Sequence, residues 1–163
     1  MINFLLSYSF MGTHSNILFC RRTLDGKIVR YVMVYHQYDG HLQGVGIELA
    51  TFLKNINYIR NGFNLNDRHK LGQIANGLGC MVAQYVALQK KEVGNFYIES
   101  TDSPMTADYN YTVIYDETKN TTFVSVNHYK LTPEMTIGEF YDYCTKGEEE
   151  DGEEEDGELS EEE

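Results

Sequence analysis

The stretch NILFCRRTLDGKIVRYVMVY, residues 16–35, decides the fold of this chain. Its first part, Asn16 to Arg22, and its last part, Ile28 to Tyr35, are rich in the apolar, β-branched and aromatic residues that favour strands. Between them lies Leu24-Asp-Gly-Lys27, and an Asp-Gly pair between two such runs is a strong signal for a hairpin turn. The stretch therefore predicts two antiparallel strands.

Apolar residues at helical spacing follow the hairpin in two segments. The first stripe comes after Gly44-Val-Gly46 and consists of Leu49, Phe52, Leu53 and Ile56. The second lies within Asp67 to Lys91 and consists of Leu71, Ile74, Leu78, Met81, Tyr85 and Leu88. The two stripes predict a short amphipathic helix and a longer second helix. Glycines inside the second segment each disfavour a helix by about 1 kcal/mol, so close packing or a local break is expected there.

Three further strands and a last helix complete the pattern. The strands are predicted at Asn95 to Glu99, Tyr109 to Asp116 and Thr121 to Tyr129. Thr136, three residues before Glu139, resembles a capping box and starts a helix that runs through Tyr143. The order ββααβββα predicts an α+β fold, in which helices pack on one face of an antiparallel β-sheet of about five strands.

Charge divides the chain into a neutral body and an acidic tail. Residues 1–146 carry thirteen acidic and thirteen basic residues, whereas residues 147–163 add twelve acidic residues and no basic ones. Such a segment repels itself and has almost nothing apolar to bury. We therefore predict a single domain over residues 11–146 and a disordered acidic C-terminal tail over residues 147–163. The tail favours a basic protein partner and opposes direct nucleic-acid binding.

The first ten residues, MINFLLSYSF, are apolar but lack the basic region and the cleavage site of a signal peptide. They are also too short to span a bilayer. We interpret residues 1–10 as an N-terminal extension or an edge strand, with Met11 as a second plausible start. The three cysteines are widely spaced and odd in number, which argues against a disulfide framework. The sequence thus predicts no membrane anchor and a cytoplasmic protein.

One cluster of polar residues stands out, in Tyr35-His-Gln-Tyr-Asp-Gly-His-Leu-Gln-Gly-Val-Gly46. It places His36, Asp39 and His41 at the end of a strand, before a glycine-rich entry into a helix whose free N–H groups favour an anion. Imidazole and carboxylate groups also suit a divalent metal, although no second cluster completes a ligand shell. A third interpretation is an acid–base centre on Asp39 with a histidine. The alternative to all three is that these residues cap and satisfy a tight turn.

At this cluster the chain resembles a family of small proteins from bacteria, phages and large DNA viruses. The family reads approximately MGTRANI, then YxHWDGYPxGxG and an amphipathic helix; here the matching segments are MGTHSNILF and YHQYDGHLQGVGIELATFL. The resemblance extends to Ala107 to Asp116. His14 stands where the family has Arg, Tyr38 replaces Trp, and His41-Leu42 replaces Tyr-Pro. The resemblance implies domain limits, a functional loop and a viral source, with no known reaction. The location would then be host-cell cytoplasm, or a virion.

Two classes of function follow. The first is a binding or interaction module, in which tyrosines line a groove and arginines supply cationic contacts. The tyrosines are Tyr31, Tyr35, Tyr38, Tyr109, Tyr111 and Tyr115, and the arginines are Arg21, Arg22 and Arg30. The second is a small hydrolase-like enzyme or metal-binding protein that uses His36, Asp39 and His41. We favour binding, with a small-molecule ligand and no bound cofactor. The predicted ligand-binding residues are Tyr35, His36, Tyr38, Asp39, Gly40, His41, Gly44 and Gly46.

Overall fold

The structure is a computed structural model that describes residues 12–56, 58–60, 62, 64, 66 and 69–146. The predicted N-terminal extension, residues 1–10, and the predicted disordered tail, residues 147–163, both lie outside the described residues.

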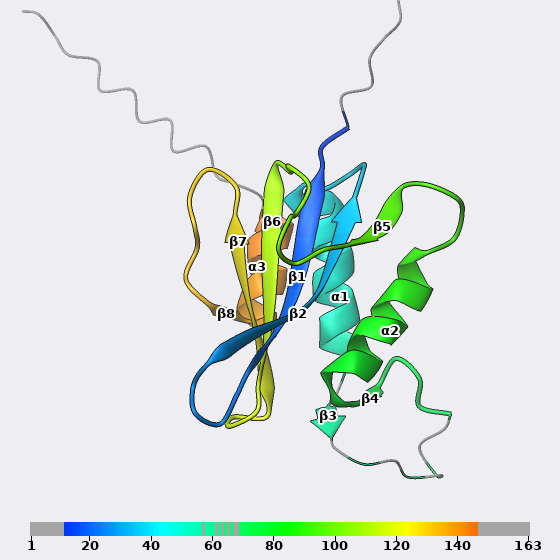
Figure 1. The fold of residues 1–163 in the computed structure, drawn as a ribbon, viewed down its shortest axis with the longest axis vertical. Coiled ribbons are helices and arrows are strands. Elements are labelled where there is room, and N and C mark those ends of the chain that lie inside the picture. Colours follow the sequence, from blue (N-terminus) through cyan, green and yellow to red (C-terminus); the bar gives the residue numbers. More distant parts are fainter. Residues whose placement is uncertain are drawn as a thin grey trace, which may run out of the picture.

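Six strands of the described chain form one mostly antiparallel sheet, in the order β5-β2-β1-β6-β7-β8 (Figure 1). The strands are β1 (Ser15–Arg22), β2 (Ile28–His36), β5 (Phe96–Glu99), β6 (Tyr109–Asp116), β7 (Thr121–Asn127) and the two-residue β8 (Met135–Thr136). The predicted α+β class, with helices packed on a mostly antiparallel sheet, is confirmed. The central pair β1 and β6 is parallel, which the strand order alone did not predict. A parallel pair needs a long crossover, and here the crossover carries two helices.

The predicted hairpin is confirmed, with Ser15 opposite His36 and Arg22 opposite Ile28. Its loop runs from Thr23 to Lys27 rather than being a two-residue turn, and Gly26 supplies the left-handed backbone at φ 80°. The register shifts between Phe19 and Cys20, which marks a bulge in the ladder.

The helices in the described part are α1 (Ile47–Asn55), α2 (Gly77–Gln89) and α3 (Ile137–Lys146). A single wide helical turn, η1 (Leu42–Gly46), leads into α1. The prediction that the second helix begins near Asp67 is wrong: α2 begins at Gly77, after a short parallel pair of strands, β3 (Tyr58–Arg60) and β4 (Ile74–Asn76). Gly72 and Gly77 have φ of 80° and 75°, so the backbone breaks where the glycines lie.

The capping box before α3 is confirmed. The backbone N–H of Thr136 donates to the Glu139 carboxylate at 2.7 Å, and the Glu139 N–H donates to Thr136 Oγ1 at 3.3 Å. The reciprocal bonds satisfy N–H groups that a helix start leaves without partners.

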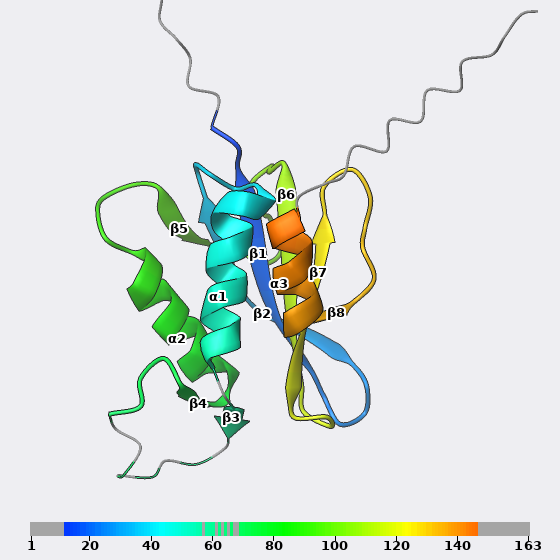
Figure 2. The same ribbon diagram turned by 180° about the vertical axis from the view of Figure 1, so that it is seen from behind.

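All three α-helices of the described chain lie on one side of the sheet, with α1 beside α3 and α2 beyond α1 (Figure 2). The core fills the space between them, and its largest fully buried side chains include Phe19, Leu49, Tyr85, Tyr111 and Phe140. The segment between β5 and β6 crosses the opposite face of β2 and β1 (Figure 1). Two contacts hold it there: Asn16 Nδ2 donates to the Met105 carbonyl at 2.7 Å, and Arg30 Nη1 donates to the Thr101 carbonyl at 3.1 Å.

Candidate functional site

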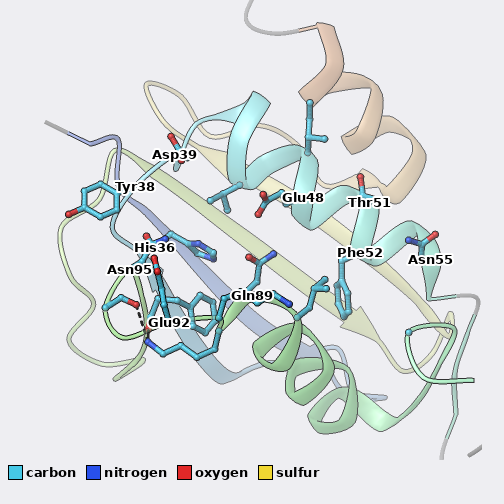
Figure 3. A pocket seen from close by; sticks show the side chains of 18 residues that line it. His36, Tyr38, Asp39, Glu48, Thr51, Phe52, Asn55, Gln89, Glu92 and Asn95 are labelled. Atoms are coloured by element: carbon cyan, nitrogen blue, oxygen red, sulfur yellow. Dashed lines mark hydrogen bonds between the residues drawn. The ribbon is translucent and has the colours of Figure 1, made fainter. Parts of the chain in front are cut away.

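A groove of about 760 Å³ lies between α1 and the C-terminal end of α2 (Figure 3). The end of β2 and the start of β5 form its floor. Its lining includes His36, Glu48, Thr51, Phe52, Gln89 and Phe96. The volume is in the range of small-molecule sites.

The helical period explains why α1 presents a polar wall to this groove. Glu48, Thr51 and Asn55 are spaced by three and four residues, so they share one face of the helix, and all three line the groove. Leu49 and Leu53 lie on the other side and are buried in the core. The core therefore fixes the orientation of the wall.

His36 lies at the floor of the groove. It is the last residue of β2, and alternation along the strand puts it on the same face as the buried Val34. Its side chain is only 5% exposed, and its Nε2 lies 3.2 Å from the hydroxyl oxygen of Tyr85. The ring forms a T-shaped pair with Phe96, with 4.9 Å between ring centroids. Burial lowers the pKa of His36 to about 4, so the ring is uncharged at neutral pH.

Backbone N–H groups in the loop before α1 form hydrogen bonds to other atoms of the same loop. Gly44 N–H donates to His41 Nδ1 at 3.1 Å, Val45 N–H donates to the Asp39 carbonyl at 2.8 Å, and Gly46 N–H donates to the His41 carbonyl at 3.2 Å. These are the N–H groups that the anion-cradle interpretation requires. Because the chain itself satisfies them, they are not available to a phosphate. His41 acts here as the cap of the turn.

The glycines of the predicted loop have close backbone neighbours. A Cβ at Gly40 would lie 2.5 Å from the carbonyl carbon of His14, and a Cβ at Gly44 would overlap the Asp39 carbonyl oxygen. The Tyr111 hydroxyl donates to the Gly40 carbonyl at 2.9 Å and ties the loop to the core. These glycines therefore shape the turn, and a side chain has no room at either position.

The structure brings three of the eight predicted binding residues to the groove: His36, Tyr38 and Asp39. Tyr35 points to the opposite face of the sheet, where its ring stacks on His14 at 5.8 Å and meets Tyr97 at 6.2 Å. The other four, Gly40, His41, Gly44 and Gly46, lie in the turn and do not line the groove.

Sequence reasoning missed the residues that α1 and α2 contribute. Those are Glu48, Thr51, Phe52, Asn55, Leu88 and Gln89. The polar face of α1 was visible as the complement of its apolar stripe, but it looked like an ordinary solvated helix face. The position of α2 beside it depends on contacts between distant segments.

The predicted groove lined by tyrosines and arginines does not form, because its residues lie on different faces of the sheet or are already engaged. Tyr111 and Tyr115 are buried on the helix side of the sheet, whereas Tyr35 is buried on the other. Each of the three arginines has a partner within the domain. Arg21 pairs with Glu117 at 3.3 Å, Arg22 pairs with Asp116 at 3.0 Å, and Arg30 donates to a carbonyl.

The histidines of the cluster do not converge on Asp39. The His36 ring bonds Tyr85, and the His41 ring accepts from Gly44. Within the residues that the structure describes, no three His, Cys, Asp or Glu side chains come together as a metal site would require. The side chains of this loop are therefore not assembled as the metal-site and acid–base interpretations require.

Comparison with family models, curated proteins and solved structures finds no match to this chain. The family resemblance stays a prediction. No helix in the described part of the chain is long and apolar enough to cross a membrane. The geometry of the groove is therefore the basis for a functional conclusion.

Proposed function

We propose that the protein is a binding protein that holds a small-molecule ligand in the groove between α1 and α2. One observation carries the proposal: an apolar floor and a few convergent polar side chains share a cavity of about 760 Å³. Small-molecule sites typically combine a mostly apolar lining with a small number of placed polar groups.

The packing of the floor residues supports a binding site that is already formed before the ligand binds. His36 is held by Tyr85 and Phe96, and the Phe52 ring lies 5.2 Å from that of Tyr85. The aromatic cluster is part of the core, so its side chains have little freedom to lose on binding. A preorganised site binds more tightly because less ordering is required.

Binding is favoured over catalysis by the state of the two histidines. A general base works best when its pKa lies near the working pH, whereas burial holds the pKa of His36 at about 4. His41 Nδ1 already accepts the Gly44 N–H. The hydroxyl beside His36 belongs to Tyr85, which is fully buried, so neither ring is a base next to a nucleophile that a substrate can reach.

Charge segregation favours a second binding function for residues 147–163. These residues carry the whole net charge, and the body is neutral. Arg21, Arg22 and Arg30 are already engaged within the domain, which favours docking of the acidic segment on a basic partner protein over docking on its own body. Deleting residues 147–163 should abolish salt-sensitive association with basic proteins; association that survives the deletion contradicts this function.

A reducing compartment, and hence the cytoplasm, is the location that we propose for this binding protein. Cys20, Cys80 and Cys144 are free thiols, and two of them are buried. Proteins of oxidising compartments usually pair their cysteines. Labelling of the free thiols in the native protein taken directly from cells tests this location.

A native mass spectrum of gently purified full-length protein tests the groove. Thr51 is exposed on the groove wall, so Thr51→Trp places a bulky ring in the cavity without disturbing the core. Ala83 is exposed on α2 outside the groove, and Ala83→Trp is the matched control. We expect an added ligand mass in the wild type and in Ala83→Trp, and its loss in Thr51→Trp. A mass retained by Thr51→Trp would place the ligand elsewhere.

A further inference from the structure

We infer that the ligand of this groove is a small organic cation, an ammonium or guanidinium group on an apolar stem, held by Glu48, Gln89 and His36. The inference rests on the proposed function and adds the chemical class of the ligand. Figure 3 shows the three side chains reaching toward the middle of the groove from α1, from the end of α2 and from β2.

The Glu48 carboxylate supplies the charge. It makes no ion pair or hydrogen bond with any residue that the structure describes. The nearest lysine along α1, Lys54, is directed to the ring of Tyr141, with 4.2 Å from its Nζ to the ring centroid. Glu48 is thus an acidic group that faces the cavity without a cation of its own.

The charges of the lining favour a positive ligand. Asp39, Glu48 and Glu92 contribute carboxylates, and Lys90 and Lys91 contribute ammonium groups. Lys90 Nζ is taken up by two carbonyl oxygens, donating to Gly94 at 3.0 Å and to Phe96 at 2.9 Å. An anion would meet three carboxylates against the one remaining ammonium group, that of Lys91, and the amide groups of the turn are already bonded.

His36 is an independent second observation. Its side chain is about nineteen-twentieths buried, at 5% exposure, yet it lines the groove. Its Nε2 is bonded to Tyr85, whereas its Nδ1 makes no hydrogen bond with any described residue. When Nε2 carries the proton and donates to the tyrosine oxygen, Nδ1 is an acceptor on a ring that lines the groove. A ligand donor that enters the groove would give this acceptor a hydrogen-bond partner.

The three groups match the donors of an organic cation. An ammonium has three N–H donors, and a guanidinium has five in a plane. The Glu48 carboxylate, the Gln89 carbonyl oxygen and His36 Nδ1 are all acceptors, and the uncharged imidazole does not repel a positive group. Phe52, Leu88 and Phe96 line the same cavity and offer apolar surface to the stem.

A matched series of four-carbon probes tests this class: n-butylguanidinium, n-butylammonium, butyramide and butyrate. Each is titrated into ¹⁵N-labelled full-length protein, and the amide shifts of Glu48, Thr51 and Gln89 report the groove. We expect saturable shifts with the two cations and none with butyrate. Glu48→Gln keeps the shape and removes the charge, and it should weaken cation binding about tenfold.

Asp142→Asn is the control, because Asp142 is exposed on α3 and the substitution changes the net charge equally. It should change the affinity less than about twofold. If butyramide or butyrate bound as tightly as the cations, the assignment of the ligand as an organic cation would be wrong, although the groove would still be a binding site. Absence of any groove shift with the cations would also overturn this assignment, whereas the bound-mass experiment with Thr51→Trp decides the proposed function separately.

Discussion

His36 Nε2 lies 3.2 Å from the hydroxyl oxygen of Tyr85, and both side chains are buried beneath the groove. The bond joins the last residue of β2 to the middle of α2, so it couples the sheet to the helix that forms one groove wall. It also gives the His36 ring nitrogen and the Tyr85 hydroxyl a hydrogen-bond partner in mostly apolar surroundings, where an unpaired polar group is costly.

Tyr85→Phe should lower the free energy of unfolding by about 1 to 2 kcal/mol, because it leaves His36 Nε2 without its buried partner. Tyr97→Phe is the matched control, since the Tyr97 hydroxyl is exposed and its bond to Gln37 is 3.5 Å long. The control should change the free energy by less than about 0.5 kcal/mol. Urea unfolding of both variants checks this, and equal losses would contradict a structural role for the buried bond.

Acid should destabilise the fold through His36. Burial lowers its pKa from the ordinary 6.5 to about 4, so the unfolded chain binds the proton more readily between these values. The stability that depends on an uncharged His36 is fully present above pH 6.5 and is lost as the pH falls toward 4. The expected loss between pH 7 and pH 5 is about 2 kcal/mol.

His36→Gln removes the titrating group and should flatten this pH dependence. Urea unfolding at pH 7, 6 and 5 measures both proteins. Restricting the range to pH 5 and above keeps most carboxylates ionised, so that their titration does not mask the effect. An unchanged slope in the variant would show that another group is responsible.

Gly44→Ala should destabilise the loop that carries Asp39 to the groove. A Cβ there would overlap the Asp39 carbonyl oxygen, so the turn must move. We expect a loss of about 2 kcal/mol or more. Gly138→Ala is the control, because a Cβ at Gly138 meets nothing within 4 Å and alanine favours the helix. Thermal unfolding should therefore rank Gly138→Ala at or above the wild type, and a reversed ranking would refute the crowded turn.

Thr136→Ala should remove the N-terminal cap of α3 and lower the free energy of unfolding by about 1 kcal/mol. The Thr136 hydroxyl and N–H both bond the Glu139 carboxylate at 2.7 Å and hold the pKa of Glu139 below its ordinary value. Thr145→Ala, at the other end of the same helix, removes one exposed bond to the Asp142 carbonyl. Chemical denaturation should separate the two variants; a cost at Thr145 as large as that at Thr136 would argue against the cap.

Local signals in the sequence predicted local structure well. The Asp-Gly loop, the capping box at Thr136 and the apolar stripe of α1 each depend on residues a few positions apart. The parallel pairing of β1 with β6 was not predictable in this way, because it joins residues more than ninety positions apart, such as Ser15 and Tyr109. The broken start of α2 was signalled by glycines, but helical periodicity outweighed them.

The candidate site was predicted in part for the same reason. His36, Tyr38 and Asp39 were found because they cluster in the sequence, whereas Gln89 reaches the groove only through the packing of α2 beside α1. His36 was predicted to bind a ligand, with acid–base chemistry as an alternative, and burial makes it an uncharged group in the floor of the groove. That environment arises from Tyr85 and Phe96, which are distant in sequence.

The bound mass of gently purified full-length protein tests the central claim most directly. The account predicts one small ligand on the wild type and none on Thr51→Trp, whose new ring fills the groove. A bare mass for the wild type, or the same added mass on Thr51→Trp, would contradict a ligand in the groove between α1 and α2.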